Sequence, residues 1–372
     1  MKNILLVLLV LALIGTTIVW VRYGGGSPYP DLSTAPALHS DSLETVVEFA
    51  EPVGNVAVNR DGRLFFTVHP ESRPTGNKLL EYVRGAAVPF PSGAAQTELF
   101  DTVLGVAIDR FNRLWTIDHG NHGLRPARIV AIDLNTNEVL RHQALSADIA
   151  PAGSFLQDLQ ISVDGGTIII ADASFWRKSP AIIVYDVETG DARRVLESHA
   201  SVSAENYVIR SQDRDMKFLG GIASLRGGID GIALDHEWLY FGALSGSSLY
   251  RVKLSDLRNK KLPPGQLANR VERYSDKPLS DGLSVDLGGN IYITDVEHNS
   301  VFVVGEDRDL KTLIESPDIR WPDALSFGPG GYLYIADSAL PELILQSREH
   351  IEANGPYRIY RFRPGFEGVP GQ

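Results

Sequence analysis

A β-hairpin motif recurs six times along this chain of 372 residues. In its clearest copy, residues 281–286 alternate in polarity, residues 287–290 (Leu-Gly-Gly-Asn) form a turn, and residues 291–295 return. Alternation with a period of two is typical of a half-buried strand, and glycine tolerates the positive φ angles of tight turns. The other copies begin at Asn55, Gly105, Asp158, Asp230 and Asp323. Repeated units of this kind bury their apolar faces by stacking on one another.

The spacing of the six copies predicts the architecture. Successive copies start 50, 53, 72, 51 and 42 residues apart, which fits one four-stranded blade per copy. Residues 46–49 precede the first copy and can complete the last blade, which would close the ring. We therefore expect an all-β, six-bladed β-propeller over residues 42–372. The longest step contains an insertion at residues 198–226, and the sequence is compatible with either a lid or a disordered segment there.

An apolar segment precedes the repeats. Residues 4–21 carry no charge, and as a helix they would extend roughly 27 Å, close to the thickness of a bilayer's hydrocarbon core. Residues 1–23 are therefore expected to be a transmembrane anchor or a signal helix, and the Gly-, Pro- and Ser-containing residues 24–41 a linker. Either form places the propeller outside the cytoplasm, periplasmic or secreted, and an anchor would tether it to the membrane through residues 4–21 alone.

Composition excludes several classes of function. The net charge of −11 repels phosphate backbones, so nucleic-acid binding is not expected. The chain has no cysteine, which excludes disulfides, thiolate nucleophiles and cysteine-ligated metal centres. The motifs of P-loops, dinucleotide-binding folds, α/β-hydrolases and zinc metalloproteases do not occur in the sequence. The expected partner is a small molecule, and the expected oligomeric state is a monomer.

Several segments, in a fixed order, resemble a known family. They include residues 62–70 (Gly-Arg-Leu-Phe-Phe-Thr-Val-His-Pro), 109–120 (Asp-Arg-Phe-Asn-Arg-Leu-Trp-Thr-Ile-Asp-His-Gly), 126–136 and 321–325. From about residue 45 to 365 the chain resembles the major royal jelly protein/Yellow family, in particular its bacterial-type members related to L-dopachrome tautomerase. The resemblance implies a secreted six-bladed propeller that binds small aromatic amines or catechol-derived compounds, with dopachrome isomerisation in some members. The insect members carry cysteines, which this chain lacks.

Blade geometry predicts a polar mouth of the central channel. The first strand of each blade runs away from this mouth and the second strand returns, so first-strand starts and second-strand ends share one face. The predicted ligand-binding residues on this face are Asn55, Asp158, Asp172, Asp230, Asp295, Asp323 and Asp337. Carboxylates crowded at low dielectric must share protons, pair with cations, cap backbone groups or hold a metal ion.

Three functions are compatible with this mouth. The first is to bind, and to isomerise by proton transfer, a small aromatic or cationic molecule. Its candidate catalytic residues are Asp118, His119, Asp281 and His298. The second, implied by similarity of blade position to gluconolactonases and paraoxonases, is a calcium-dependent lactonase or esterase with Asn55, Asp230 and Asp281 as metal ligands. The third is a non-catalytic protein-binding module, and whether the protein is an enzyme stays open.

Structural roles are open for the same residues. Aspartate at a strand start commonly accepts backbone N–H groups, and an Asp-Gly step, as at residues 230–231 and 281–282, simply makes a turn. Aromatic residues that could supply ring faces to a ligand also fit the alternation of core positions. They are Phe65, Phe66, Trp115, Trp176, Phe241 and Trp321.

Overall fold

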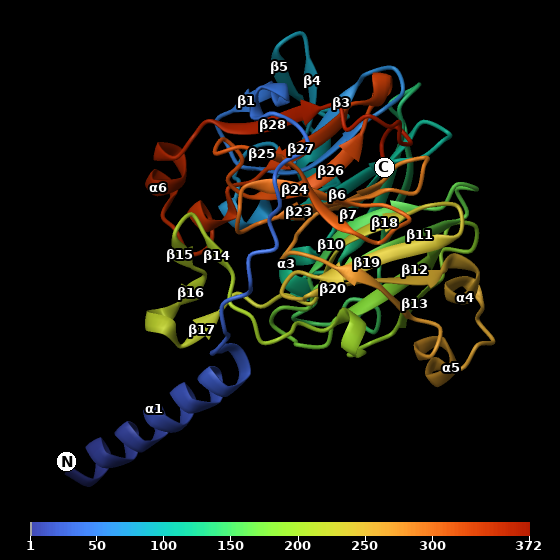
Figure 1. Ribbon diagram of the computed structural model, residues 1–372. Coiled ribbons are helices and arrows are strands. Elements are labelled where there is room, and N and C mark those ends of the chain that lie inside the picture. The colour runs from blue at the N-terminus through green and yellow to red at the C-terminus, as the bar shows by residue number, and fades with distance from the viewer. Residues whose placement is uncertain (1) are drawn as a thin grey trace.

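The structure, a computed structural model that describes residues 2–372, contains six four-stranded antiparallel sheets arranged around one axis (Figure 1). The first three blades are β2–β5 (Val53–Val58, Leu64–Val68, Leu79–Val83, Ala86–Pro89), β6–β9 (Val103–Ile108, Arg113–Asp118, Arg128–Asp133, Val139–Ala144) and β10–β13 (Leu156–Ile161, Thr167–Asp172, Ala181–Asp186, Ala192–Val195). The next two are β18–β21 (Ile229–Leu234, Trp238–Ala243, Ser248–Lys253, Glu272–Asp276) and β22–β25 (Leu283–Val285, Ile291–Asp295, Ser300–Val304, Leu310–Glu315). The last joins β26–β28 (Pro322–Phe327, Leu333–Asp337, Tyr357–Phe362) to β1 (Glu44–Phe49). The six-bladed prediction is confirmed.

Ring closure depends on the first strand of the chain. β1 pairs antiparallel with β28, so one blade contains strands from both ends of the propeller sequence. This pairing covers the edge of β28, which would otherwise present unpaired backbone groups to solvent. The strand predicted at residues 46–49 lies within β1.

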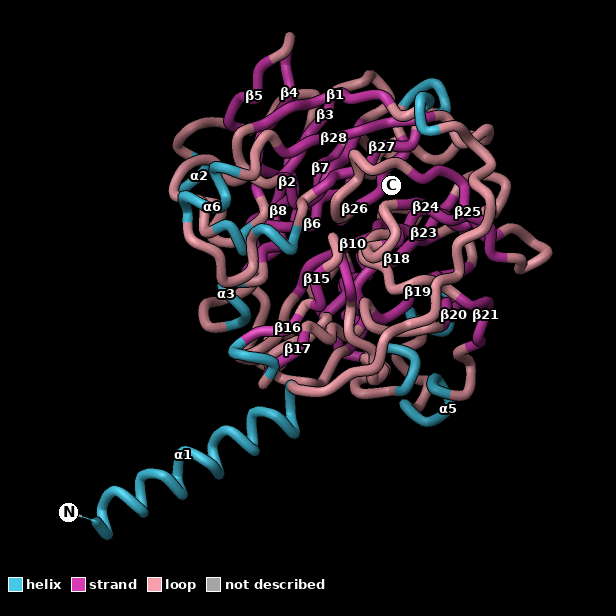
Figure 2. Tube along the Cα trace, turned by 60° about the vertical axis from the view of Figure 1, so that its left-hand side comes forward, coloured by secondary structure: helices cyan, strands magenta, loops and turns pink. Residues whose placement is uncertain are grey.

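The core lies between the blades. Six apolar clusters lie between neighbouring blades, as when Phe65 of β3 packs with Val106 and Leu114 of the second blade, and one of them also takes in residues of the insertion. Because successive side chains of a strand point to opposite faces, each sheet supplies residues to the cluster on either side of it. The inner strands β2, β6, β18 and β26 are buried along their whole length. Figure 2 shows β6, β10 and β26 near the middle of the molecule.

The end of the chain fills the channel at the face opposite the predicted mouth. The backbone N–H groups of Ile108 and Phe327 donate to the carbonyls of Gly371 and Gln372, each at 2.8 Å. The N–H of Leu287 donates to the carbonyl of Glu367, also at 2.8 Å. Residues 367–372 therefore bridge the second, fifth and sixth blades.

Six α-helices lie outside the blades within residues 2–372. They are α1 (Lys2–Tyr23), α2 (Ala95–Glu98), α3 (Gly120–Gly123), α4 (Leu254–Arg258), α5 (Pro264–Ala268) and α6 (Arg348–Ala353). α1 projects from the propeller, and its last turn lies beside the insertion (Figures 1 and 2). The insertion has defined structure and forms two hairpins, β14–β15 (Arg210–Ser211, Arg214–Asp215) and β16–β17 (Lys217–Phe218, Ala223–Ser224).

Candidate functional site

Five polar side chains from the starts of the inner strands meet inside the channel. They are Asn55 of β2, Asp158 of β10, Asp230 of β18, Asp281 just before β22 and Asp323 of β26. The carboxyl groups of Asp230 and Asp281 are within hydrogen-bonding reach of each other. Blade geometry predicted that these strand starts would converge, and the structure brings them together.

Glycines beside these residues set the spacing between blades. Gly231 and Gly282 each follow a site aspartate, and neither has a positive φ angle; Gly231 lies within β18, so the Asp-Gly step there does not make a turn. A Cβ atom on Gly231 would collide with the carbonyl oxygen of Asp281, and one on Gly282 would lie 2.7 Å from the carbonyl oxygen of Asp323. Each glycine therefore lets the next blade approach closely, and this approach brings the carboxyl groups into contact.

Burial controls the protonation of the carboxyl cluster. It raises the pKa of Asp158 to about 7 and the pKa of Asp281 to about 6. Burial, with the negative charge of Asp281, also raises the pKa values of Asp230 and Asp323 well above the ordinary range. Near neutral pH the cluster therefore contains both protonated and ionised carboxyl groups, which can donate and accept protons.

A buried lysine lies next to this cluster. Lys277 precedes the inner strand of the fifth blade, and its ammonium group donates to the carbonyl of Pro278 and to the hydroxyl of Ser280, each at 2.9 Å. Burial lowers the pKa of Lys277 to about 7, although the carboxyl groups around it act in the opposite direction. Sequence reasoning missed this residue, because a single lysine before a strand carries no distinguishing pattern.

A cavity of about 380 Å³ opens on the mouth side of the cluster. Asp230, Asp281, Asp323 and His69 line its polar end. Its walls are mostly apolar and include Phe155, Phe175, Trp176, Phe218, Leu225 and Leu244. Asn55 and Asp158 instead line a water-sized polar space of about 10 Å³, which also contacts Gln372. The large cavity is thus an aromatic-walled pocket with three carboxyl groups at its base.

Histidines and one glutamate form a second polar group at the side of this cavity. His122 Nε2 lies 2.8 Å from Glu71 Oε1, and His69 Nε2 lies 3.5 Å from Asp323 Oδ2. Burial would raise the pKa of Glu71, but the hydrogen bond and charge of His122 outweigh it and lower that pKa to about 2. Burial lowers the pKa of His69 to about 4, so Glu71 is ionised and His69 neutral at pH 7. Sequence reasoning missed Glu71 and His122, which lie in short helical turns between strands, Glu71 in a 3-10 turn (Pro70–Ser72) and His122 in α3.

His119 lies behind the cavity wall. Its Nδ1 atom accepts the backbone N–H of His122 at 2.9 Å, and its ring packs against Phe155 with 4.7 Å between ring centroids. Burial lowers the pKa of His119 to about 3, so this predicted catalytic residue is a neutral imidazole that positions His122.

The aspartates at the second-strand ends cap backbone groups. Asp118 accepts from the N–H groups of Thr102 at 3.0 Å and Gly120 at 2.9 Å. Asp172 accepts from the N–H of Phe155 and from Arg194, at 2.7 and 2.8 Å. These carboxylates hold the loops that lead into the inner strands, and neither lines the cavity.

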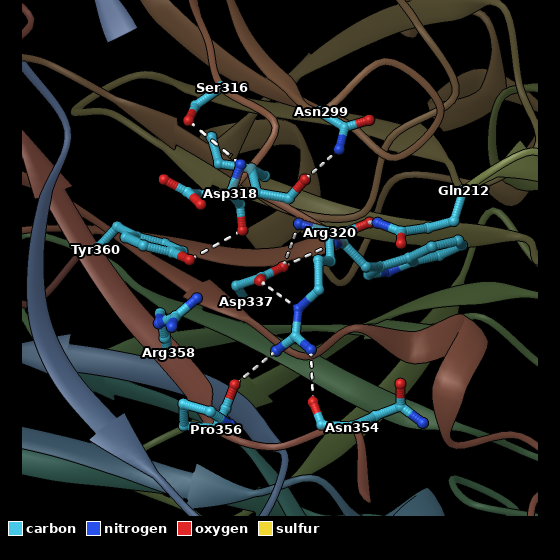
Figure 3. Close-up of polar contacts among 12 residues, drawn as sticks. Gln212, Asn299, Ser316, Asp318, Arg320, Asp337, Asn354, Pro356, Arg358 and Tyr360 are labelled. Carbon is cyan, nitrogen blue, oxygen red and sulfur yellow. Dashed lines mark hydrogen bonds and ion pairs between the residues drawn. The ribbon is translucent and has the colours of Figure 1, made fainter. Parts of the chain in front are cut away.

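Asp337 and Asp295 have the same kind of role. Asp337 accepts the N–H of Arg320 at 3.0 Å, while the guanidinium of Arg320 donates to the carbonyls of Asn354 and Pro356 (Figure 3). Asp295 lies 2.9 Å from Nδ1 of His298, and this hydrogen bond raises the pKa of His298 to about 9. These three predicted site residues also lie outside the cavity lining.

The three residues predicted to bind calcium do not offer a suitable donor set. The Asn55 side-chain oxygen accepts the N–H of Val56 at 2.8 Å, and Oδ2 of Asp281 accepts the indole N–H of Trp321 at 2.7 Å. Of these three residues, Asp230 alone retains a buried oxygen, Oδ1, without a hydrogen-bond donor. Calcium takes six to eight oxygen ligands, and no group of three or more acidic or histidine side chains suited to a metal occurs in residues 2–372.

Of the aromatic residues considered from sequence, Trp176 lines the cavity. Five others are buried in the clusters between blades: Phe65, Phe66, Trp115, Phe241 and Trp321.

Comparison with known proteins places this propeller in a family. The sequence profile described as "Major royal jelly protein" matches residues 101–359, from the second blade into β28. The chain belongs to the major royal jelly protein family. The family match covers Asp158, Asp230, Asp281 and Asp323, and the resemblance seen in the sequence is confirmed.

Among curated members of the family, "Major royal jelly protein 9" from Apis mellifera is 28% identical over 172 residues. This alignment covers 43% of the present chain and 38% of the honeybee protein.

Solved structures share the fold at low sequence identity. A gluconolactonase from Xanthomonas campestris superposes with a TM-score of 0.53 at 16% identity, covering 86% of this chain and 88% of that one. The calcium-binding protein regucalcin from Agrobacterium tumefaciens superposes with a TM-score of 0.56 at 16% identity, covering 91% and 98%. At this identity the similarity extends to the propeller architecture alone.

Proposed function

We propose that this royal jelly family propeller binds a small organic cation with an aromatic or apolar body in its cavity. The proposal rests on the arrangement of Asp230, Asp281 and Asp323 at the base of an aromatic-walled pocket of about 380 Å³. A pocket of that volume suits a small molecule. The N-terminal apolar helix supports an extracytoplasmic location for the site.

The charge state of the pocket favours a cation. The carboxyl groups share protons because burial and mutual repulsion disfavour a second negative charge. An ammonium group bound between them would offset that repulsion, so one further carboxyl group would ionise and release its proton. The rings of Phe155, Phe175 and Trp176 would cover the rest of the ligand, with cation–π attraction where a ring face meets the charge.

Isomerisation is the reaction that these groups support. Asp281, with a pKa of about 6, can take a proton from a carbon atom of the ligand. A protonated neighbour, Asp230 or Asp323, can return a proton to a second atom. The proton count balances, and no oxidant or reductant is needed, which defines a tautomerase.

Titration calorimetry with a panel of aromatic amines and catecholamines tests the proposal. The wild-type protein is expected to bind at least one of them and to release protons on binding below pH 7, seen as an enthalpy that depends on the buffer. Asp281→Asn should weaken binding at least tenfold, while Asp307→Asn, on an exposed loop, should bind like the wild type. Equal binding by the two variants, or no binding by the wild type, would remove the proposal and leave the protein-binding module.

A further inference from the structure

The last turn of α1 forms part of the cavity. Val19 and Tyr23 line it together with residues of the blades and the insertion. The hydroxyl of Tyr23 donates to the carbonyl of Trp176 at 2.8 Å, and the guanidinium of Arg22 donates to the carbonyl of Arg177 at 2.7 Å. The end of the helix is therefore fixed to the rim of the pocket.

The segment after α1 strengthens this attachment. Ser27 forms a parallel bridge with Tyr207 of the insertion, and Arg226 donates to the carbonyl of Gly24 at 2.6 Å. The hydroxyl of Ser224 donates to the carbonyl of Gly25 at 2.7 Å. Backbone and side-chain contacts thus connect the helix to β17 and its neighbours, and α1 leaves the molecule beside β16 and β17 in both views (Figures 1 and 2).

Exposed apolar side chains surround the same opening. Trp176, Leu219 and Leu345 line the cavity, yet they are 50%, 66% and 70% exposed. They come from three separate places: the loop after β11, the insertion, and the loop before α6. Apolar residues gathered on one rim mark a surface that contacts an apolar partner.

The nature of α1 identifies that partner as lipid. An 18-residue stretch within Asn3–Tyr23 has a mean hydropathy of 2.9, and none of that stretch is buried in the protein. A helix of 21 residues extends about 30 Å, the thickness of a bilayer's hydrocarbon core. Because the last turn of this span lines the cavity, a membrane around α1 would reach the rim formed by Trp176, Leu219 and Leu345.

We propose that this rim inserts into the outer leaflet beside α1, and that the cavity takes its ligand from the lipid phase. The ligand would be an amphiphilic amine, with its ammonium group at the carboxyl cluster and its apolar part along the aromatic walls. The assignment of the ligand as an amine rests on the function proposed above, whereas the docking of the rim to the membrane does not.

Fluorescence of the full chain in phosphatidylcholine nanodiscs tests the docking. Trp20→Phe removes the tryptophan of α1, Trp115 and Trp321 are fully buried, and Trp238 lies at the start of β19 beneath Arg251. Lipids brominated in their acyl chains should then quench the emission of Trp176. The quenching should disappear in Trp20→Phe/Trp176→Phe, and equal quenching in the two proteins would overturn the docking.

Matched charge substitutions give a second readout. Leu219→Asp with Leu345→Asp, in the Trp20→Phe background, should reduce the quenching of Trp176 at least threefold. Leu287→Asp should leave it unchanged, because Leu287 is 63% exposed on the hairpin between β22 and β23, at the other face of the propeller. An equal effect of the two changes would contradict the assignment of this rim.

The ligand class is tested separately. Dodecylamine supplied in the nanodiscs is expected to bind the wild-type protein at least tenfold more tightly than water-soluble tyramine. Equal affinities would overturn supply from the lipid phase. If tyramine bound but Trp176 were not quenched, the docking would be refuted and the proposed function would stand. If Trp176 were quenched but neither amine bound, the docking would stand and the proposed function would be refuted.

Discussion

At the scale of single residues, the carboxyl group of Asp281 experiences opposing influences. The indole N–H of Trp321 donates to it at 2.7 Å and stabilises the anion. Burial disfavours the anion more strongly and raises the pKa of Asp281 to about 6. Asp230, which stays protonated to higher pH, is the neighbouring acid. The pair therefore holds one base and one acid near neutral pH, an arrangement suited to proton transfer and costly to stability.

Replacing Asp281 with asparagine should reveal that cost. The pKa of Asp281 is about 6 when folded and 3.8 when unfolded, so between these values the folded state holds the extra proton and stability falls as pH rises. Asparagine does not titrate, so Asp281→Asn does not lose stability in this way. The difference in free energy of unfolding between the variant and the wild type should therefore grow in favour of the variant from pH 4 to 7. The gain should reach about 3 kcal/mol, because each pKa unit corresponds to about 1.4 kcal/mol. Urea unfolding curves that differ equally at pH 4 and pH 7 would contradict the assignment.

Calcium should not affect stability. The side-chain oxygen of Asn55 and Oδ2 of Asp281 accept hydrogen bonds from protein donors, so the three predicted residues offer fewer free oxygens than the six to eight that calcium takes. A metal that bound only the folded state would raise Tm with concentration, so thermal unfolding in millimolar calcium and in EDTA should give the same Tm. If calcium raised the Tm of the wild type and Asp230→Asn abolished that increase, the result would instead favour the lactonase function.

Some site residues were predictable from sequence and others were not. Asp230, Asp281 and Asp323 begin equivalent strands of a repeat, so their positions follow from blade geometry alone. Glu71 and His122 lie in short helical turns between strands, and their contact joins the first and second blades. The strand-end aspartates share the predicted face, yet they cap backbone groups, and strand geometry alone cannot tell a capping carboxylate from a free one.

At the scale of elements, the approach of neighbouring inner strands depends on glycine. Gly231→Ala would push a methyl group into the carbonyl of Asp281 and separate β18 from β22. Overpacking of this kind costs about 1–3 kcal/mol, so Tm should fall and amine binding should weaken. Gly265→Ala is the matched control, because a Cβ there meets nothing within 4 Å in α5, where alanine is favoured. Equal Tm values for the two variants would refute this role of Gly231.

The insertion shows why its structure was not predictable from sequence. Its strands are only two residues long, too short to give a pattern of alternation. Ile209 and Met216 are buried in the cluster that joins the sixth and first blades. Contacts with the propeller therefore stabilise this segment, and only the folded blades supply them.

At the scale of the whole molecule, we expect the pairing of β1 with β28 to stabilise the ring. Val47→Asp would place a charge in the apolar cluster at this junction, where Val47 is 1% exposed. An unpaired buried charge commonly costs more than about 3 kcal/mol, so unfolding should shift to clearly lower urea concentrations. Thr45→Asp, exposed on the same strand, should have little effect, and a similar loss in both variants would contradict a role for ring closure.

The overall fold was predictable because six copies at regular steps specify the blade count, and an apolar strand before the first copy specifies the closure. The contacts of residues 367–372 were not predictable, since the partners Ile108, Leu287 and Phe327 lie in three different blades.

Those final contacts have a consequence for exchange with the surroundings. Gly371 and Gln372 bridge the inner strands at one end of the axis, and between them and the carboxyl groups there is room for one water molecule at most. The central channel is therefore closed at this face and does not run through the propeller. A ligand that bound as proposed would therefore enter and leave through the mouth, and a second molecule could bind only after the first had dissociated.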